Sequence, residues 1–515
     1  MQGRIIMLEN GKILVGKGEK SVYLEPSMAN RHGLIAGATG TGKTVTLKVL
    51  AEAFSDLGVP VFMADIKGDL AGTCKKGEAN ENVMGRVEKL GLEGFELKSY
   101  PVRFFDVFQE GGHPVRSTVS DMGPVLLSRL LELTEVQEGV LNIVFHIADD
   151  NDLLLVDLKD LRSMLTYVGE HAKEFTVDYG NITKQSIGAI QRKLLQLQDE
   201  GGDMFFGEPM MDMRDMLSTE EGKGVISILH CEKLYQKPLV YSTFLLWILS
   251  ELFENLPEVG DCDKPKMIFF FDEAHLLFDD APKALIQKIE QTVKLIRSKG
   301  VGVYFVTQNP MDVPDSVLSQ LNNRIQHSLR AYTPAEMKNV KAAAQSFREN
   351  PAFNTVDVIT ELKTGEALVS CLDEDGKPSV VEKATICPPQ SYMGAIDTER
   401  RKSVIEYSEL YGKYEEAVDN ASAYEALQEV FAAENKVTSK NSSTKKSVVE
   451  RAATNAMSTL TRETAKDLVD SMLLGKDTSR RQSSFQKAAN SALRTLSGEL
   501  GKTVTRGLFS ILKGR

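Results

Sequence analysis

The chain of 515 residues has few cysteines and no long apolar run. Its five cysteines include no C-x-x-C pair, which argues against a disulfide framework and a zinc ribbon. The longest apolar stretch, around FLLWILSELF, is interrupted by Glu251 and predicts a buried helix, because a bilayer-spanning helix needs a longer uncharged run. The opening MQGRIIMLENGKILVGKGEK has no signal-peptide pattern. We therefore expect a soluble, cytoplasmic protein of two to four domains.

Positive charge is scarce outside the C-terminal part of the chain. The formal net charge is −11, yet residues 436–515 hold 16 lysines and arginines against 6 aspartates and glutamates. Residues 1–435 therefore carry a net charge of −21. This division predicts an acidic body with a basic tail that meets nucleic acid, an acidic membrane surface or the body itself, or that stays solvated without a partner.

The stretch GATGTGKT has the spacing G-x-x-x-x-G-K-[ST] of a phosphate-binding P-loop. Glycines at these positions let backbone N–H groups surround a phosphate, Lys43 would reach the β- and γ-phosphates, and Thr44 would bind Mg²⁺. A strand-like LIAG precedes the loop, and a helical pattern, VTLKVLAEAF, follows and aims its N-terminus at the anion. The residues predicted to bind the nucleotide are Gly37, Ala38, Thr39, Gly40, Thr41, Gly42, Lys43, Thr44 and Val45.

Two further apolar strands end in polar residues suited to nucleotide chemistry. MIFFFDE ends in Asp272, a predicted Mg²⁺ partner, and in Glu273, which is placed to act as general base on water. GVYFVTQ ends in Gln308, whose amide suits a hydrogen bond to the γ-phosphate or to the attacking water. The alternative is that these residues simply close their strands. A glutamate directly after the Mg²⁺ aspartate favours hydrolysis over phosphoryl transfer to a small molecule.

Arginines that could stabilise the transferring phosphoryl group lie near the last of these strands. Arg297 precedes it, and Arg324 and Arg330 flank IQHSL after it. We select Arg330 and Arg297 as candidate fingers, against the alternative that they are surface or helix-capping residues.

A second pattern, D-x-x-G, lies at Asp65 to Gly68 in ADIKGDL. A GTPase would also need N-K-x-D, which the chain does not contain, so a GTPase switch is disfavoured. Lys67 and its neighbours Asp65 and Asp69 face the nucleotide, a neighbouring subunit or solvent.

The order of elements predicts an α/β fold with a mostly parallel, doubly wound sheet. FELKSY and VRFFDVF both have strand-like sequences, and residues 391–435 have a helical, charged sequence. We divide the chain into a small N-terminal β element (1–25), a P-loop core (26–115 and 216–390), a helical insertion (116–215), a helical extension (391–435) and a basic flexible or amphipathic tail (436–515).

The combination of GATGTGKT, the distant FFFDEAH and RSKGVGVYFVTQNP resembles the HerA/FtsK superfamily of motor ATPases. The long helical insertion between the two motifs resembles the HerA branch. HGLIAGATGTGKTVTLKVLAEAFSDLGVPVFMADIKGDLAG and GGDMFFGEP resemble the YjgR-type bacterial proteins, up to about residue 390 and into the tail. DEAH does not indicate a DEAH-box helicase, because no arginine-rich motif of a second domain follows.

This resemblance implies a RecA-like core of the P-loop NTPase class, ATP and Mg²⁺ as ligands, and a homo-oligomer, expected to be a hexameric ring with ATP sites between subunits. It also implies translocation on double-stranded DNA driven by ATP hydrolysis. Lys43 and Thr44 would then have the Walker A roles, Asp272 and Glu273 the Walker B roles, and Gln308 the sensor role. Two alternatives stay open: an ATPase acting on protein or at a membrane through LGKTVTRGLFSILKGR, and a small-molecule kinase.

Overall fold

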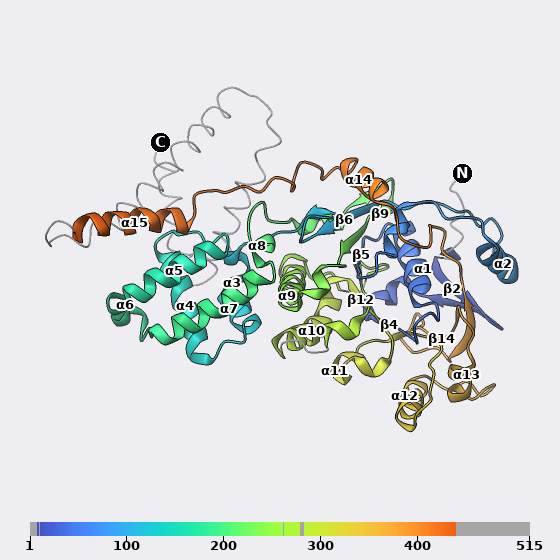
Figure 1. Ribbon diagram of the computed structural model, residues 1–515. Coiled ribbons are helices and arrows are strands. Elements are labelled where there is room, and N and C mark those ends of the chain that lie inside the picture. The colour runs from blue at the N-terminus through green and yellow to red at the C-terminus, as the bar shows by residue number, and fades with distance from the viewer. Residues whose placement is uncertain (1–7, 10, 261, 279–282, 439–515) are drawn as a thin grey trace, which may run out of the picture. The chain divides into compact units, whose positions relative to one another are not determined.

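The computed structural model describes residues 8–9, 11–260, 262–278 and 283–438 (Figure 1). The chain divides into two compact units, Met1–Gln428 and Glu429–Arg515, and the sheet lies entirely in the first. In the described part of the chain, no helix combines the length and the apolar character that crossing a membrane requires. The predicted basic tail (436–515) lies outside the described residues except for 436–438, which end helix α15 (Ala423–Thr438).

One sheet of 13 strands organises the described part of the first unit. Its order is β1-β2-β15-β14-β13-β4-β12-β11-β5-β10-β6-β7, with β3 paired to β2. Neighbours from β13 to β7 are parallel, and the other pairs are antiparallel. The strands are β1 Leu8–Glu9, β2 Lys12–Lys17, β3 Ser21–Leu24, β4 Gly33–Ala36, β5 Val61–Asp65, β6 Val102–Asp106, β7 His113–Pro114, β10 Ile226–His230, β11 Met267–Phe271, β12 Val301–Thr307, β13 Asn323–Gln326, β14 Glu366–Ser370 and β15 Glu382–Ile386. A separate ribbon pairs β8 Thr219–Glu220 with β9 Lys223–Gly224. The predicted α/β fold with a mostly parallel sheet is confirmed.

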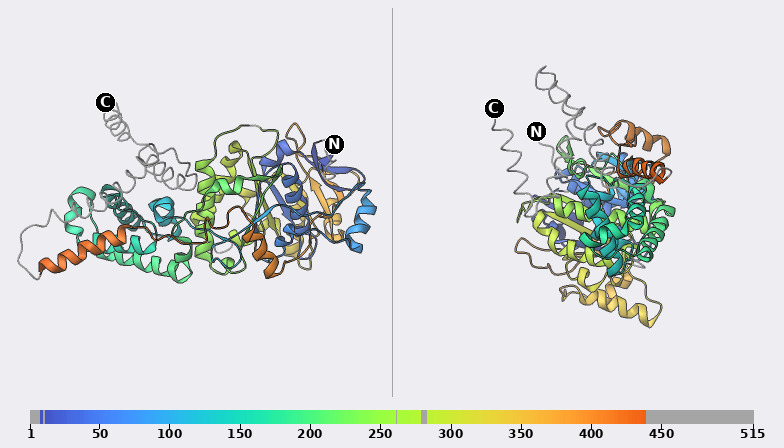
Figure 2. Two further views of the ribbon diagram at one scale, coloured as in Figure 1. Left: turned by 90° about the horizontal axis from the view of Figure 1, so that it is seen from above. Right: turned by 90° about the vertical axis from the view of Figure 1, so that its left-hand side faces the viewer.

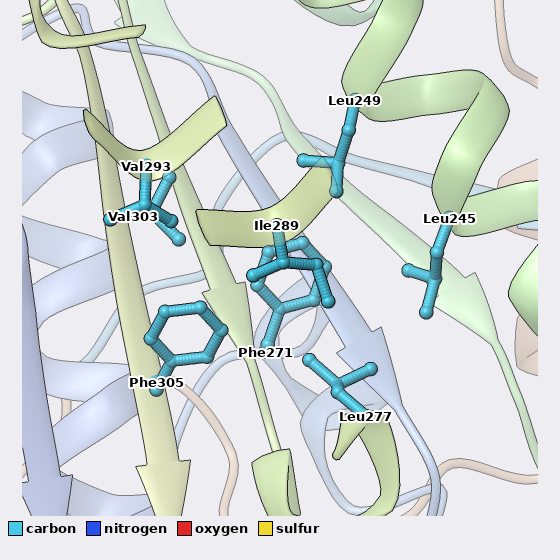
Figure 3. A pocket seen from close by; sticks show the side chains of 8 residues that line it. All are labelled: Leu245, Leu249, Phe271, Leu277, Ile289, Val293, Val303 and Phe305. Carbon is cyan, nitrogen blue, oxygen red and sulfur yellow. The ribbon is translucent and has the colours of Figure 1, made fainter. Parts of the chain in front are cut away.

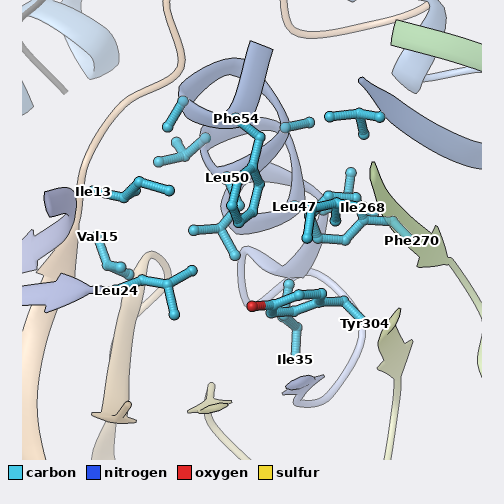
Figure 4. Packing of buried hydrophobic residues seen from close by; sticks show 14 of the residues in the cluster. Ile13, Val15, Leu24, Ile35, Leu47, Leu50, Phe54, Ile268, Phe270 and Tyr304 are labelled. Atoms are coloured by element: carbon cyan, nitrogen blue, oxygen red, sulfur yellow. The ribbon is translucent and has the colours of Figure 1, made fainter. Parts of the chain in front are cut away.

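Helices cover both faces of the central strands, because those strands are apolar along their whole length rather than on alternate residues. Helix α1 (Lys43–Asp56) packs Leu50 and Phe54 against one face, where Phe270 and Tyr304 point toward it (Figure 4). Helices α9 (Pro238–Asn255) and α10 (Lys283–Leu295) cover the other face and enclose a small apolar cavity with β11 and β12 (Figure 3). The residues that line this cavity are Leu245, Leu249, Phe271, Leu277, Ile289, Val293, Val303 and Phe305.

A helical group is inserted between β7 and the β8–β9 ribbon, and it packs on α9 and α10 (Figure 2). Side chains at the starts of several of these helices accept backbone N–H groups: Thr118 from Asp121, Asp157 from Lys159, and Thr183 from Ser186. The helices are α3 Val119–Leu130, α4 Glu135–Asp150, α5 Leu158–Glu170, α6 Ala172–Tyr179, α7 Lys184–Asp199 and α8 Gly202–Phe205. The remaining helices are α2 Glu81–Leu90, α11 Asp315–Leu318, α12 Pro334–Gln345, α13 Thr355–Glu361, α14 Thr398–Glu406 and α15 Ala423–Thr438.

Two local predictions are wrong, and tertiary contacts explain both. FELKSY forms no strand, because its backbone bonds to other loops: the Lys98 N–H donates to Gln390 O at 3.0 Å and the Tyr100 N–H to Thr73 O at 3.1 Å. The extension is not continuously helical, because residues 407–422 separate α14 from α15. This segment is held by Tyr414, which is buried and whose carbonyl accepts a 2.7 Å hydrogen bond from Arg116.

The N-terminal strands are continuous with the core. Strand β2 pairs with β15 in antiparallel register, with Thr385 opposite Lys17. Strands β1, β2 and β3 therefore extend the main sheet, and Ile13, Leu14 and Val15 are fully buried in its core.

The packing of α1 yields a first testable prediction. Leu50→Ala should lower the free energy of unfolding by about 2–5 kcal/mol, because Leu50 is fully buried and its removal leaves a cavity under the sheet. Leu195→Ala on α7 is the matched control, since Leu195 is 45% exposed and its loss should change stability by no more than about 0.5 kcal/mol. Urea unfolding of the three proteins measures both effects. Equal destabilisation by the two substitutions would contradict the described packing of α1.

Candidate active site

The strand register brings the predicted site residues to one edge of the sheet. Ala36, at the end of β4, pairs with Thr307 of β12, and Phe271 of β11 pairs with Phe305 of β12 and with Ala64 of β5. The P-loop, Gln308, Asp272 and the loop after β5 therefore all follow the carboxyl ends of adjacent parallel strands. Ligands bind at this edge in open α/β sheets.

The P-loop wraps around the ammonium group of Lys43. Lys43 is 8% exposed and donates to Gly37 O at 2.7 Å and to Ala38 O at 3.2 Å. Gly40 has a φ of +77°, and a Cβ placed there would meet no atom within 4 Å, so this side of the loop is open. The loop thus combines a buried cation, the N-terminus of α1 and open space, which fits a phosphate group.

A buried histidine fixes the loop from behind. His327, just past β13, accepts from the Thr46 hydroxyl at Nε2 (2.8 Å) and donates from Nδ1 to Glu366 O (3.0 Å). The carbonyl of Glu366 can only accept, and this sets the tautomer. A Cβ at Gly37 would lie 2.5 Å from the Cβ of His327, so only glycine fits there. Burial lowers the pKa of His327 to about 4, which keeps the ring neutral.

Glu273 lies at the centre of a small polar network. Its Oε2 accepts from Gln308 Nε2 at 3.3 Å, and its Oε1 forms an ion pair with Lys67 Nζ. Gln308 in turn accepts a 3.4 Å hydrogen bond from the Thr39 hydroxyl of the P-loop. The structure therefore brings together Thr39, Gln308 and Glu273, three of the predicted site residues, and adds Lys67 to them.

The two carboxylates at the end of β11 are in different electrostatic environments. Burial and the neighbouring charge of Glu273 raise the pKa of Asp272 to about 7. Burial opposes ionisation of Glu273 too, but the hydrogen bonds from Lys67 and Gln308 hold its pKa below the ordinary value. Burial lowers the pKa of Lys43, against the attraction of both carboxylates. Glu273 is thus kept as the anion, which a general base must be.

These residues also fit a nucleotide with Mg²⁺. Asp272 is 3% exposed and offers a carboxylate in a site where positive charge would stabilise its ionised form. A polar hollow of about 310 Å³ opens beside Gln308 and is also lined by His275, Asn309 and Asp312. Within the described residues no cluster of three or more His, Cys, Asp or Glu side chains forms a separate metal site. Mg²⁺ would therefore need oxygen ligands from the nucleotide as well, as is common for this ion.

The predicted arginines lie outside this network. Arg297 belongs to the short helix Ile296–Lys299 before β12, so the length of β12 places it roughly 20 Å from the edge that carries the site. Arg324 donates to Leu321 O at 2.9 Å and to Leu318 O at 3.0 Å, which is a structural role. Arg330 is exposed, four residues after the carboxyl end of β13. The structure does not bring Arg297 to the site of its own chain. Among the described residues Arg330 makes no hydrogen bond or ion pair there, although the carbonyl of Ser328, two residues before it, accepts from the N–H of Ala38 at 2.8 Å.

Sequence reasoning missed His327 and Thr46 and left the role of Lys67 open. His327 stands in IQHSL, where no spacing relates it to the P-loop. Lys67 stands inside the D-x-x-G pattern, which was the available signal for that loop.

A parallel sheet with one strand, β12, between the P-loop strand and the strand of Asp272 and Glu273 defines the chain as a P-loop NTPase. Comparison with known families then gives a closer assignment. The family model described as helicase HerA-like C-terminal matches residues 10–515. The chain belongs to this family, which confirms the resemblance to the HerA branch.

Curated relatives include archaeal helicases. The chain is 21% identical over 369 residues to the DNA double-strand break repair helicase HerA of Sulfolobus acidocaldarius, over 70% of this chain and 66% of that protein. It is 29% identical over 380 residues to the probable helicase MJECL08 of Methanocaldococcus jannaschii, over 70% of this chain and 68% of that protein. The chain thus spans about two thirds of the length of the curated relatives it matches.

Solved structures overlay most of the chain at low identity. The plasmid coupling protein TrwB in complex with ADP and Mg²⁺ is 14% identical, with a TM-score of 0.46, over 71% of this chain and 89% of that one. VirB4 of Thermoanaerobacter pseudethanolicus is 15% identical, with a TM-score of 0.48, over 74% and 97%. These scores lie below 0.5, so the ligands and partners of those proteins do not carry over to this chain.

The buried ring behind the P-loop predicts a pH dependence of stability. The pKa of His327 is about 4 in the folded chain and about 6.5 when unfolded, so the unfolded chain binds more protons between these values. Stability from this residue is complete above pH 6.5 and is lost as pH falls toward 4. Between pH 7 and pH 5, the free energy of unfolding should fall by about 2 kcal/mol more in the wild-type chain than in His327→Gln.

Urea midpoints at the two pH values measure this difference. Burial raises the pKa values of Asp65 and Asp272 to about 7, so these residues stabilise the fold as pH falls, opposite to His327. Their contributions are the same in the wild type and in His327→Gln, and they cancel when the pH responses of the two proteins are compared. His146→Gln on the exposed side of α4 is the matched control and should follow the wild type. The same pH response in all three proteins would contradict the neutral, buried ring.

Proposed function

We propose that this chain is an ATP-hydrolysing motor of the HerA type. The observation that carries the proposal is the placement of Glu273: a nearly buried carboxylate beside the Asp272 strand end, linked through Gln308 to the P-loop. A kinase for small molecules does not need a water-activating glutamate directly after the Mg²⁺ aspartate, because its acceptor is a substrate hydroxyl rather than water. The arrangement supports hydrolysis by water.

Each residue of the network has a distinct part in the proposed reaction. Lys43 and the P-loop backbone would bind the phosphates, while Thr44 and Asp272 would hold Mg²⁺. The bound Mg·ATP supplies the phosphoryl group and the charge of the metal. Glu273 would take a proton from water at its carboxylate, and Gln308 would orient that water or report on the γ-phosphate through its amide.

A ring of subunits would complete the site. Arg324 is engaged by carbonyls of its own chain, and Arg297 lies at the far edge of the sheet. A cation for the transition state would then come from a neighbouring subunit, with Arg330 or Arg297 as the donor in trans. This supports a homo-oligomer, and family membership favours a hexamer.

Double-stranded DNA is the proposed polymer on which the motor moves. Support comes from the family and from relatives named as DNA double-strand break repair helicases. The acidic body, with its net charge of −21, favours the alternative that the motor acts on protein or at a membrane through the basic tail. DNA binding draws its affinity from phosphate neutralisation, so salt dependence separates these cases.

Steady-state ATPase assays with and without linear double-stranded DNA test the proposal. The wild-type chain should hydrolyse ATP, and DNA should raise the rate more at low salt than at moderate salt. Glu273→Gln should reduce kcat by about 10²-fold or more in both conditions, since it removes the general base. Lys43→Ala should lose nucleotide binding, whereas Glu273→Gln should retain it.

The outcomes are distinct. If the rate depends on Glu273 but does not change with DNA, the chain is an ATPase whose partner is a protein or a membrane rather than DNA. Binding to vesicles would then test the membrane alternative. An unchanged rate in Glu273→Gln would refute the assignment of the base.

A further inference from the structure

One contact of the network keeps Glu273 ionised but is assigned no step in the proposed reaction. Lys67 Nζ forms an ion pair with Glu273 Oε1, and the two side chains differ strongly in exposure: 50% for Lys67 and 6% for Glu273. The lysine therefore reaches from solvent onto a nearly buried carboxylate. Its solvated lysine makes this ion pair weaker than a fully buried one, and opening it requires that another positive charge or hydrogen-bond donor meet the buried carboxylate.

The loop that carries Lys67 has a fixed shape. The carboxylate of Asp65 accepts from the N–H of Gly68 at 2.8 Å and from the N–H of Ala71 at 3.1 Å. Gly68 has a φ of +77°, a backbone conformation that residues with a side chain rarely adopt. The backbone around Lys67 is thus held in place, while its side chain is half free.

Glu273 itself is held in an uncommon conformation. Its φ is +46° and its ψ is +48°, the left-handed region that a residue with a Cβ seldom adopts. Lys67 binds one oxygen and Gln308 the other, so both carboxylate oxygens are engaged. A base whose oxygens are both engaged, one of them by a cation, is poorly placed to take a proton from water.

We propose that Lys67 is a positioning residue that restrains the catalytic base, and that opening of the Lys67–Glu273 ion pair precedes hydrolysis. The proposal rests on the proposed ATPase function and adds a regulatory residue to the same site. Hydrogen bonds from Thr39 to Gln308 and from Gln308 to Glu273 connect the P-loop to this ion pair. An occupied P-loop would compete for Thr39 and Gln308 and so loosen the hold on Glu273.

Lys67→Met tests the restraint, because methionine keeps the length of the side chain and removes its charge. Without DNA, kcat for ATP should rise roughly two- to fivefold, the range open to a half-exposed ion pair. The KM for ATP should stay within about twofold, because the hydrogen bond and ion pair of Lys67 go to Glu273 and not to the P-loop. The rate with saturating DNA should equal that of the wild type, so that the stimulation ratio falls.

Two variants separate this role from general effects of losing a lysine. Lys67→Arg keeps a cation that can pair with Glu273 and should restore the low rate without DNA. Lys233→Met is the matched control: Lys233 is also 50% exposed and pairs with Glu110 at 2.6 Å, outside the site. It should leave kcat and KM unchanged.

Each result decides the proposal. An unchanged rate without DNA in Lys67→Met overturns the restraint. A lost rate that Lys67→Arg restores also overturns it, because Lys67 would then be needed in the reaction itself.

A wild-type chain without Glu273-dependent ATPase would refute the proposed function rather than the restraint. In that case, hydrogen exchange of the backbone amides at residues 272–276 tests whether Lys67 restrains Glu273. Lys67→Met should accelerate exchange there relative to Lys233→Met, and equal rates would overturn it.

Discussion

Two adjacent carboxylates end a buried strand, and the rest of the site is arranged around their charge. Asp272 and Glu273 are 3% and 5% exposed, and like charges this close cannot both be stable without cations nearby. The two carboxylates differ in how their charge is stabilised. The pKa of Asp272 rises to about 7, whereas the hydrogen bonds of Lys67 and Gln308 keep Glu273 ionised. Environments that separate two neighbouring carboxyl groups in this way suit them to different roles, in the proposed reaction a metal ligand and a base.

The sheet supplies the cations for this pair from two directions. Lys43 comes from the P-loop after β4, and Lys67 from the loop after β5, while β11 lies between β12 and β5. The chain connects β4 to β5 through α1 alone, yet these strands are separated by β12 and β11. This crossover brings the two lysines to the carboxylates from opposite sides. Strand order, rather than any local motif, thus determines which charges meet.

Features that depend on local sequence were predictable, and those that depend on distant contacts were not. The P-loop and the acidic end of β11 each occupy a few consecutive residues, so their spacing could be recognised directly. His327 meets Thr46 across 281 residues, and Lys67 meets Glu273 across 206, separations at which a single sequence gives no signal. FELKSY had the composition of a strand, but Lys98 and Tyr100 are drawn instead to the carboxylate of Asp56 on α1. Tertiary contacts outweighed local preference there.

The parts of the site differ in how firmly they are held, and this difference locates the side chains that can move in the proposed motor. Helix α1 is tied near its N-terminus by Thr46 to His327 and further along by Glu52, whose buried carboxylate accepts from the N–H groups of Gln390 at 2.7 Å and Ser391 at 3.1 Å. The side-chain contacts of Glu273 are weaker: a 3.3 Å hydrogen bond from Gln308, an ion pair with the exposed Lys67, and a 3.4 Å approach of His275 Nδ1. Elements with few buried contacts open at lower free energy than elements tied into the core. Changes in the nucleotide are therefore expected to move the side chains of Glu273 and Lys67, while the backbones of the P-loop and of the loop after β5 stay fixed.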